Sequence, residues 1–430
     1  MNLTLKEKQM LNGKQGNLIR EAMKFLVSLG EAFNAEKMID ISYANVLLAS
    51  GFWGRGPLTN ELVEEAVKEG VRVKIPTTFN NWGCGSLFSP DSIWETLEVS
   101  NSTREQILRE NVIAKRLGIV PTCTCAPYLV CDTGWYPFGT HISTVESSAI
   151  VYFNSVLSAR SNRDCISSFY SAITGKYPAF GFHLDENRYG SYHFDIQTEV
   201  ENSLDYGLLG IYAGKISGVE TPVFTGLGRP RSEALVELSA ALASSGTVTM
   251  FHIVGVTPEA LNLEIACGGK KPIKKIIVTK DTLVETHQHL SDREGKLDFV
   301  CLGCPHYSIY EMKKVSEILN GKSIQKDVTL WICTSPQTAM FAEMAGYADI
   351  IRKAGGTIMS GPNFCPLFGP GKPGPEYAFA HPNYSVGSFA TDAAKQAYYA
   401  KANLRAEKVF LGSTEKCIDA AVEGEWRTNQ

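Results

Sequence analysis

The chain has 430 residues, of which 44% are hydrophobic and 20% are charged, as in ordinary soluble globular proteins. Its 41 basic and 45 acidic residues leave a net charge of −4, which argues against a nucleic acid or a membrane surface as partner. The first residues lack the apolar core of a signal peptide, and no run of about 18 apolar residues is present to span a bilayer. We therefore expect a cytoplasmic protein.

Alternating helix and strand signals begin at the N-terminus. The spacing of Thr4 and Glu7 matches a capping box. Apolar residues then recur on one helical face, namely Leu18, Ala22, Met23, Leu26 and Leu29. A strand over 38–48, a helix over 60–69 and a strand over 71–77 follow. This β-α-β order predicts a parallel sheet with helices on its faces.

The alternation resumes after a polar, glycine-rich middle. We expect strands over 247–254, 276–279, 298–302 and 327–333, and helices over 308–319 and 336–354. The predicted class is α/β, with two or three subdomains in a chain of this length. Binding residues in such sheets gather at the carboxyl ends of the strands. The Gly- and Pro-rich stretch 368–375 is either a loop over a site or a surface connection.

Three of the eleven cysteines each end a strand and open a polar turn: Cys125, Cys304 and Cys365. Three thiolates brought together by folding suit an iron–sulfur cluster with one iron left open, as a Lewis-acid dehydratase needs. Cys123 is an alternative to Cys125, because alternate residues of a strand face the same side. An odd number of cysteines without an export signal favours thiols and metal ligands over a disulfide framework, although a lone cysteine is commonly a core residue.

Cys301 and Cys304 form a Cys-x-x-Cys pair, which by itself fits zinc or redox chemistry. Pro305 suits the first turn of a helix, so we predict that Cys304 lies at a helix start. There the backbone N–H groups would stabilise its thiolate. Cys301 is predicted to be a buried, inert thiol within an apolar strand.

Seven segments spread over nearly the whole chain carry distinctive residues. They are CAPY (125–128), GTHI (139–142), VESSA (145–149), NSVLSARSNR (154–163), GFHLDENR (181–188), FHIVGVTPEA (251–260) and GCPH (303–306). In this order they resemble the aconitase X family. The resemblance implies a hydro-lyase built of several α/β domains around a central iron–sulfur site, with the whole of 1–430 forming the large-subunit catalytic region.

The resemblance also implies the site residues. A cluster of the 4Fe-4S or 3Fe-4S type would be held by Cys125, Cys304 and Cys365. The catalytic positions fall on Glu146, Ser147 and Lys395, and the substrate contacts on these three and on Ala49, Ser50, Asn80 and Asn81. A lysine can hold an anionic group, asparagine and serine can orient a substrate, and a glutamate can move a proton. Without the resemblance, Lys395 reads as a solvated helix residue, Glu146 as a helix cap and Asn80 as a turn residue.

Departures from the family pattern bear on the substrate. Asn45 and Leu48 stand where relatives usually have His and Gly. Leu48 would crowd a loop that in relatives approaches a phosphate, because only glycine lacks a Cβ. The predicted substrate is therefore cis-3-hydroxy-L-proline or a related hydroxy acid, with 5-phosphomevalonate as the alternative.

The resemblance further implies a missing swivelling domain that carries a catalytic serine in a Gly-Ser-Ser motif. Here Ser244 and Ser245 follow Ala243 at the end of a predicted helix. We expect the serine to come from a separate small subunit in a heterodimer. Two other functions stay open: a cysteine-nucleophile enzyme using Cys304 with His306, and a non-catalytic zinc or cluster scaffold with Cys123 as a fourth ligand.

The remaining polar residues of these segments receive no role from sequence. An isolated histidine is commonly a satisfied structural group. The histidines concerned are His141, His183, His252 and His306. Arg160 and Arg163 are either a carboxylate clamp or part of an ion-pair network inside the fold.

Overall fold

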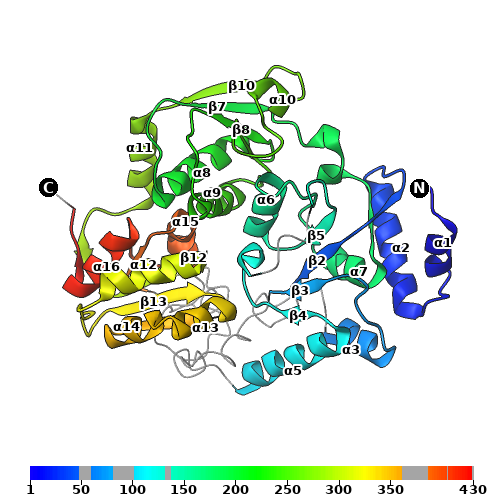
Figure 1. Ribbon diagram of the computed structural model, residues 1–430, viewed down its shortest axis with the longest axis horizontal. Coiled ribbons are helices and arrows are strands. Elements are labelled where there is room, and N and C mark those ends of the chain that lie inside the picture. Colours follow the sequence, from blue (N-terminus) through cyan, green and yellow to red (C-terminus); the bar gives the residue numbers. More distant parts are fainter. Residues whose placement is uncertain (48–59, 81–100, 131–136, 361–385, 404, 429–430) are drawn as a thin grey trace.

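The computed structural model describes residues 1–47, 60–80, 101–130, 137–360, 386–403 and 405–428. The chain forms three α/β regions, each with a parallel sheet, placed around the middle of the molecule (Figure 1). The predicted class of several α/β units with parallel sheets is confirmed. Four predicted site residues lie outside the described residues, namely Ala49, Ser50, Asn81 and Cys365.

The first region holds a four-stranded parallel sheet. Its strands lie in the order β4 (Val120–Pro121), β3 (Thr77–Phe79), β2 (Tyr43–Val46) and β5 (Ile142–Thr144). Its helices are α1 (Leu5–Leu11), α2 (Asn17–Ala32), α3 (Asn60–Lys68), α5 (Asn101–Leu117), α6 (Ser147–Ser155) and α7 (Ile166–Thr174). Val46 and Phe79 pack with apolar residues of α2, α5 and α7, whereas Tyr43 packs with Phe153 of α6 on the opposite face. An antiparallel pair, β1 (Met38–Asp40) and β6 (Lys176–Pro178), completes the region.

The second region has a parallel sheet in the order β10 (Lys274–Val278), β7 (Tyr192–Ile196), β8 (Pro222–Thr225) and β9 (His252–Ile253). Its helices are α8 (Ser203–Ser217), α9 (Ser232–Ser245), α10 (Leu263–Ala266) and α11 (Lys280–Leu290). Helices α8 and α9 lie very close together because glycines face the contact. A Cβ on Gly210 would lie 2.6 Å from the Cβ of Ala241, so a larger residue there would push the helices apart.

The third region has a five-stranded parallel sheet. The order is β14 (Gly356–Ser360), β13 (Thr329–Thr334), β12 (Phe299–Tyr307), β15 (Ser388–Thr391) and β16 (Lys408–Leu411). Its helices are α12 (Ile309–Leu319), α13 (Pro336–Met344), α14 (Tyr347–Lys353), α15 (Ala394–Asn403) and α16 (Thr414–Glu423). The short strands β11 (Gly295–Lys296) and β17 (Glu425–Trp426) pair antiparallel beside it.

One apolar cluster continues through all three regions. It contains Tyr43 of the first region, Phe194 and Phe224 of the second, and Phe299 and Trp331 of the third, all at most 1% exposed. Burial of large side chains is the main source of stability in such folds. The shared core therefore fixes the regions relative to one another.

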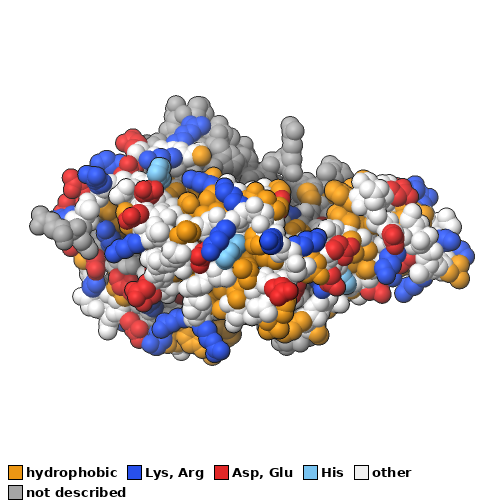
Figure 2. Space-filling model, turned by 90° about the horizontal axis from the view of Figure 1, so that it is seen from above, with side chains coloured by type: hydrophobic (Ala, Val, Ile, Leu, Met, Phe, Trp, Pro, Cys, Tyr) orange, Lys and Arg blue, Asp and Glu red, His pale blue; other side chains and the backbone are white. Residues whose placement is uncertain are grey.

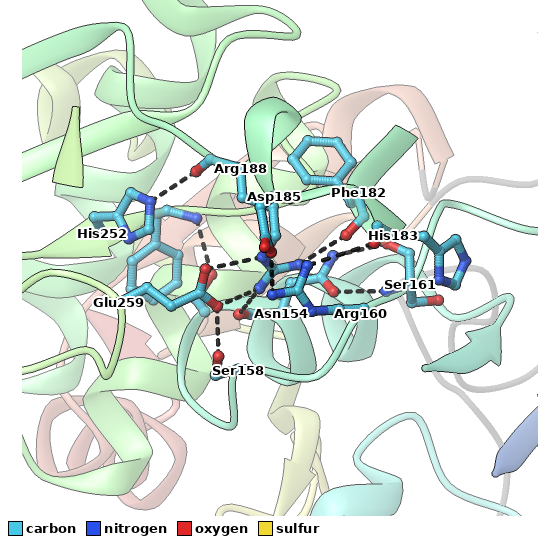
Figure 3. A network of polar contacts seen from close by, with 12 residues as sticks. Asn154, Ser158, Arg160, Ser161, Phe182, His183, Asp185, Arg188, His252 and Glu259 are labelled. Carbon is cyan, nitrogen blue, oxygen red and sulfur yellow. Dashed lines mark hydrogen bonds and ion pairs between the residues drawn. The ribbon is translucent and has the colours of Figure 1, made fainter. Parts of the chain in front are cut away.

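A buried polar network adds to this fixation where the first and second regions meet (Figure 3). Arg188 is 1% exposed and makes a two-point ion pair with Glu259, with Nε–Oε2 at 2.9 Å and Nη2–Oε1 at 2.6 Å. Its other N–H groups donate to the carbonyls of Asn154 and Phe182, each at 3.0 Å. Arg160 lies in the same network through an ion pair with Asp185, which supports the ion-pair alternative for this residue.

Local signals predicted several elements correctly. Thr4 and Glu7 form the predicted capping box at the start of α1. Ser308 and Glu311 form another at the start of α12, which ends at Leu319 as predicted. In both cases the donors and acceptors lie within four residues, so the sequence contains the whole interaction.

Other boundaries were wrong. The strand predicted over 71–77 is replaced by β3, which begins only at Thr77, and the strand predicted over 247–254 shrinks to the two residues of β9. The segment 38–48 contains two strands rather than one, and 336–354 contains two helices. Gly346, with φ of 76°, ends the first of these helices, because a left-handed residue cannot continue it.

The surface carries charges of both signs. Figure 2 shows one face of the molecule, on which Lys and Arg side chains are interspersed with Asp and Glu, with apolar groups between them. No helix in the described residues has the length and apolar character needed to cross a membrane.

Candidate active site

The carboxyl ends of strands from the first and third sheets carry the predicted site residues. Asn80 directly follows β3, and Cys125 comes four residues after β4. Glu146 follows β5 and caps α6, whose first residue is Ser147. In the third region Cys304 lies in β12, and Lys395 is the second residue of α15, shortly after β15. Carboxyl ends of parallel strands are the usual binding edges of α/β sheets.

Three contacts join these edges across the two regions. The backbone N–H of His306 donates to Sγ of Cys125 at 3.3 Å. A 2.9 Å hydrogen bond links Oγ1 of Thr124 to Nδ1 of His306. Nζ of Lys395 lies 3.9 Å from Oε1 of Glu146. The fold therefore brings Cys125 to the segment of Cys304, and Glu146 to Lys395.

Both described cysteines of the predicted cluster suit metal ligation. Cys125 and Cys304 are 4% and 3% exposed, and neither is in a disulfide, whereas Cys123 is disulfide-bonded. A backbone N–H, that of His306, also donates to Sγ of Cys125. Buried thiols and N–H donors to sulfur are features of iron–sulfur sites, so these residues fit the implied cluster.

The predicted reason for choosing Cys304 was wrong. Cys304 and Pro305 lie within β12, and α12 begins later, at Ile309. Gly303 has a φ of 88°, and a Cβ there would collide with the carbonyl of Cys333, so glycine is required next to Cys304. The strand is irregular between Leu302 and Tyr307, which breaks its pairing with β13.

Cys301 belongs to the core, as predicted. It is 2% exposed, and its Sγ lies 3.6 Å from Sγ of Cys333 on the neighbouring strand. Nε2 of Gln396 donates to the same sulfur at 3.4 Å. These contacts place Cys301 with core side chains of the third region.

Buried polar atoms without partners line one face of the first sheet. Asn80 is fully buried, and in the described ranges, which stop at this residue and resume at 101, neither its Oδ1 nor its Nδ2 has a hydrogen-bond partner. The same holds for Oδ1 of Asn45 and Oγ1 of Thr144. Asn45 pairs in register with both Thr78 and Thr144, so these side chains share a face, and Asn80 follows two residues after Thr78.

An unsatisfied buried amide costs about 1–3 kcal/mol of stability. Two amides and a hydroxyl on one face of the first sheet therefore indicate a ligand that completes their hydrogen bonds. Sequence reasoning assigned no role to Thr144. Its only signal was a polar residue at the end of a short strand, directly before the Glu146 segment.

Lys395 and Glu146 are held firmly. Lys395 is 4% exposed, so the alternative of a solvated helix residue is wrong. Glu146 is the N-cap of α6 and accepts from the backbone N–H of Ser148 at 3.4 Å and from its hydroxyl at 2.9 Å. Its role as a helix cap and its contact with Lys395 coexist, which fixes the carboxylate toward the third region.

Three further carboxyl groups, those of Asp392, Glu237 and Glu311, interact electrostatically with one another. Asp392 accepts from Tyr307 and, at 2.7 Å, from Oγ1 of Thr414, and burial raises its pKa. Burial also raises the pKa of Glu237 well above its ordinary value, an effect strengthened by Asp392 and opposed by the positive charge of Lys395. Lys395 therefore faces Glu146 and, in Glu237, a carboxyl group whose raised pKa favours its neutral form.

Glu311 provides a pH test of these carboxyl groups. Burial raises its pKa to about 8, so the folded protein holds a proton there that the unfolded chain loses above pH 4.5. The stability contributed by this proton is complete below that pH and is lost as the pH rises through 8. Glu311→Gln keeps the acceptor for the N–H of Ser308 without the charge. We expect it to stabilise the protein by about 1–2 kcal/mol at pH 9, a value reduced because the side chain is partly exposed.

The measurement is the thermal midpoint of wild type and variant at pH 5 and pH 9, with a gain only at pH 9. Glu317→Gln is the matched control, because Glu317 lies on the same helix but is exposed beside Lys313. An equal gain of Glu311→Gln at both pH values would show that the carboxyl does not titrate as stated.

The histidines have structural partners. Nδ1 of His141 lies 3.0 Å from Nδ1 of His183, and burial lowers the pKa of both rings. Nε2 of His252 bonds the carbonyl of Arg188 at 2.8 Å. Together with the bond of His306 to Thr124, these contacts account for all four histidines that sequence left without a role. Arg163 is exposed beside β5.

Three protein-family models match consecutive parts of the chain: the first domain of aconitase X over 1–186, the second over 190–288 and the third over 297–423. The chain belongs to the aconitase X family. In this family's terms, Cys125 and Glu146 lie in the first domain, and Cys304 and Lys395 in the third. The candidate site is therefore formed where these two domains meet.

Named relatives fall into two groups. The phosphomevalonate dehydratase large subunit of Methanothermobacter thermautotrophicus is 36% identical over 82% of this chain and 85% of its own length. The cis-3-hydroxy-L-proline dehydratase of Pseudomonas aeruginosa is 30% identical over 97% of this chain and 69% of its own length. The crystal structure of aconitase X from Thermococcus kodakaraensis, in its holo-form, matches 98% of this chain and 100% of that chain, with a TM-score of 0.81 and 30% identity.

Proposed function

We propose that this aconitase X dehydratase removes water from a small hydroxy acid, with cis-3-hydroxy-L-proline as the preferred substrate. The observation that carries this choice is the pair formed by buried Lys395 and partly buried Glu146, 3.9 Å apart. An amino acid presents one carboxylate and one ammonium group, which complement a lysine and a glutamate side by side. A phosphorylated acid presents negative charge only, and its negative groups would have to lie beside Glu146, which already pairs with Lys395.

The second candidate substrate is 5-phosphomevalonate. It is favoured by sequence identity, which is 36% to a phosphomevalonate dehydratase large subunit against 30% to a cis-3-hydroxy-L-proline dehydratase. Leu48, on which part of the argument against a phosphate depends, lies outside the described residues.

The proposed cofactor is a 4Fe-4S or 3Fe-4S cluster held by Cys125, Cys304 and Cys365. Its support is the buried thiols of the first two and the N–H of His306 that faces Cys125. When bound, such a cluster supplies a Lewis acid for the departing hydroxyl group. The neighbouring N–H and the low exposure of both cysteines keep water from the thiolates.

The chain's own side chains would bind and orient the substrate. Lys395 holds the carboxylate, and Glu146 accepts from the ammonium group and can take up a proton. Ser147 and the unsatisfied amide of Asn80 position the hydroxyl group. Asn81, Ala49 and Ser50 complete the proposed substrate contacts on the strength of the family resemblance.

A small subunit is the proposed partner. Several relatives are named large subunits, which implies a smaller partner for them. For this chain we propose a cytoplasmic heterodimer in which the partner brings the serine of a Gly-Ser-Ser motif. The whole chain then serves as the large catalytic subunit.

The test is anaerobic purification with the small subunit, analysis of iron, sulfide and zinc, and turnover on a panel. The panel contains cis-3-hydroxy-L-proline, 5-phosphomevalonate and an acyclic 3-hydroxy acid. We expect iron, sulfide and visible absorption, with kcat/KM for the hydroxyproline at least about 100-fold above the others. A higher value for 5-phosphomevalonate would reverse the substrate choice, and zinc without colour or turnover would favour the scaffold function.

A further inference from the structure

A tyrosine hydroxyl next to the candidate site has no hydrogen-bond partner among the residues that the structure describes. Tyr128 lies in a short 3-10 helix, Pro127–Leu129, and its side chain is 6% exposed. Its hydroxyl is fully buried, yet within the described part of the chain it bonds to no group. A buried phenol normally finds a partner, because an unsatisfied hydroxyl costs free energy. A buried hydroxyl of this kind therefore indicates that a bound molecule supplies its hydrogen-bond partner.

The ring of Tyr128 is held in place. It stacks on Tyr152 with ring centroids 3.9 Å apart and an interplanar angle of 13°. It also contacts the ring of Phe153 edge-on, at 5.8 Å and 86°. The preceding backbone is fixed as well, because the N–H of Ala126 donates to Oγ1 of Thr124 at 3.0 Å. The hydroxyl cannot turn away to another acceptor without breaking these contacts.

The surroundings of this hydroxyl belong to the candidate site. Burial raises the pKa of Tyr128 well above 10, and the nearby charges of Cys125 and Glu146 act in the same direction. The group therefore stays protonated and can act as a hydrogen-bond donor. Tyr128 is three residues from Cys125, and its helix leads from the cysteine segment toward α6, which Glu146 caps.

We propose that Tyr128 is a further substrate-binding residue, whose hydroxyl donates a hydrogen bond to an oxygen atom of the bound hydroxy acid. This inference rests on the proposed function. The acceptor for the Tyr128 hydroxyl is then an oxygen of the substrate's carboxylate or hydroxyl group. Pre-positioned donors of this kind hold a substrate without reorganisation during the reaction.

The test is Tyr128→Phe in the complex with the small subunit, with Tyr152→Phe as the matched control. The control removes the hydroxyl of Tyr152, whose ring stacks on Tyr128. Unlike the hydroxyl of Tyr128, this hydroxyl is not a buried group without a hydrogen bond. We expect kcat/KM to fall at least about tenfold for Tyr128→Phe and to stay within about twofold for the control. The thermal midpoint of Tyr128→Phe should equal or exceed that of wild type, because the variant removes an unsatisfied group.

Affinity for L-proline, measured by calorimetry, identifies the acceptor. Weaker binding by Tyr128→Phe assigns the carboxylate, and unchanged binding with lost turnover assigns the hydroxyl group; both outcomes support the proposal. A lower thermal midpoint, or turnover within twofold of wild type, would overturn it. If the wild-type complex turns over no member of the panel, the proposed function fails instead, and the midpoint still tests Tyr128.

Discussion

Serine in place of Cys304 is expected to abolish turnover and the visible absorption of the protein. A serine hydroxyl stays protonated at neutral pH and is a poor ligand for iron, whereas a buried thiolate binds it strongly. We expect a loss of at least about 100-fold in activity, together with loss of iron. Cys125→Ser and Cys365→Ser should behave in the same way. Anaerobic absorption spectra, iron analysis and rates on one preparation measure all three effects.

The controls for this result are Cys165→Ser and Cys267→Ser. Cys165 is exposed before α7, and Cys267 is buried after α10 in the second region, away from the strand ends that form the site. Both variants should keep colour and activity. Full activity of Cys304→Ser would rule out the cluster assignment, and full iron content with lost activity would point to the cysteine-nucleophile alternative.

Without a small subunit, the 430-residue chain is expected to show less than about 1% of the activity of the complex. The reason is that the adjacent serines of this chain are engaged within α9. Oγ of Ser244 donates to the carbonyl of Ala240 at 2.6 Å. Oγ of Ser245 donates to the carbonyls of Ala241 and Gly210, at 2.9 and 3.2 Å. Both hydroxyls therefore serve helix packing.

The experiment adds a partner of roughly 130–150 residues, a common single-domain length, whose gene is expected beside this one. Activity should appear only when both chains are present, and the two chains should form a stable heterodimer. Alanine in place of the partner's motif serine is the control, which should assemble but not turn over. Measurable dehydration by the large chain alone would show that the base lies within it.

Sequence predicted those features whose interactions are local. The predicted capping box at Thr4 and the predicted helix over 308–319 depend on residues a few positions apart. The strand predicted over 71–77 failed for the opposite reason. Residues 71–75 form only single hydrogen bonds to other segments, as the N–H of Val73 does to the carbonyl of Leu117, and none of the strands in the described residues pairs with them.

The same contrast between local and long-range interactions holds for the candidate site. The family resemblance named Glu146, Lys395 and the cysteines, but it could not show that Glu146 meets Lys395 across two sheets. The unsatisfied atoms of Asn80 and Thr144 could not be predicted either, because hydrogen-bond satisfaction depends on every neighbour in space. Cys304 was preferred to Cys301 because Pro305 predicted a helix start, but both Cys304 and Pro305 lie in β12. The family resemblance is therefore what supports Cys304 as a ligand.

The contact between Thr124 and His306 joins residues 182 positions apart in the chain, and this separation bears on biogenesis. A ribosome adds roughly 5–20 residues per second, so the first half of the site waits about 10–40 s before its second half is synthesised. During that interval Cys125 and the polar face around Asn80 have no third region to cover them. The proposed cluster, which would take ligands from both regions, can therefore be completed only after the third region has been synthesised and has folded against the first.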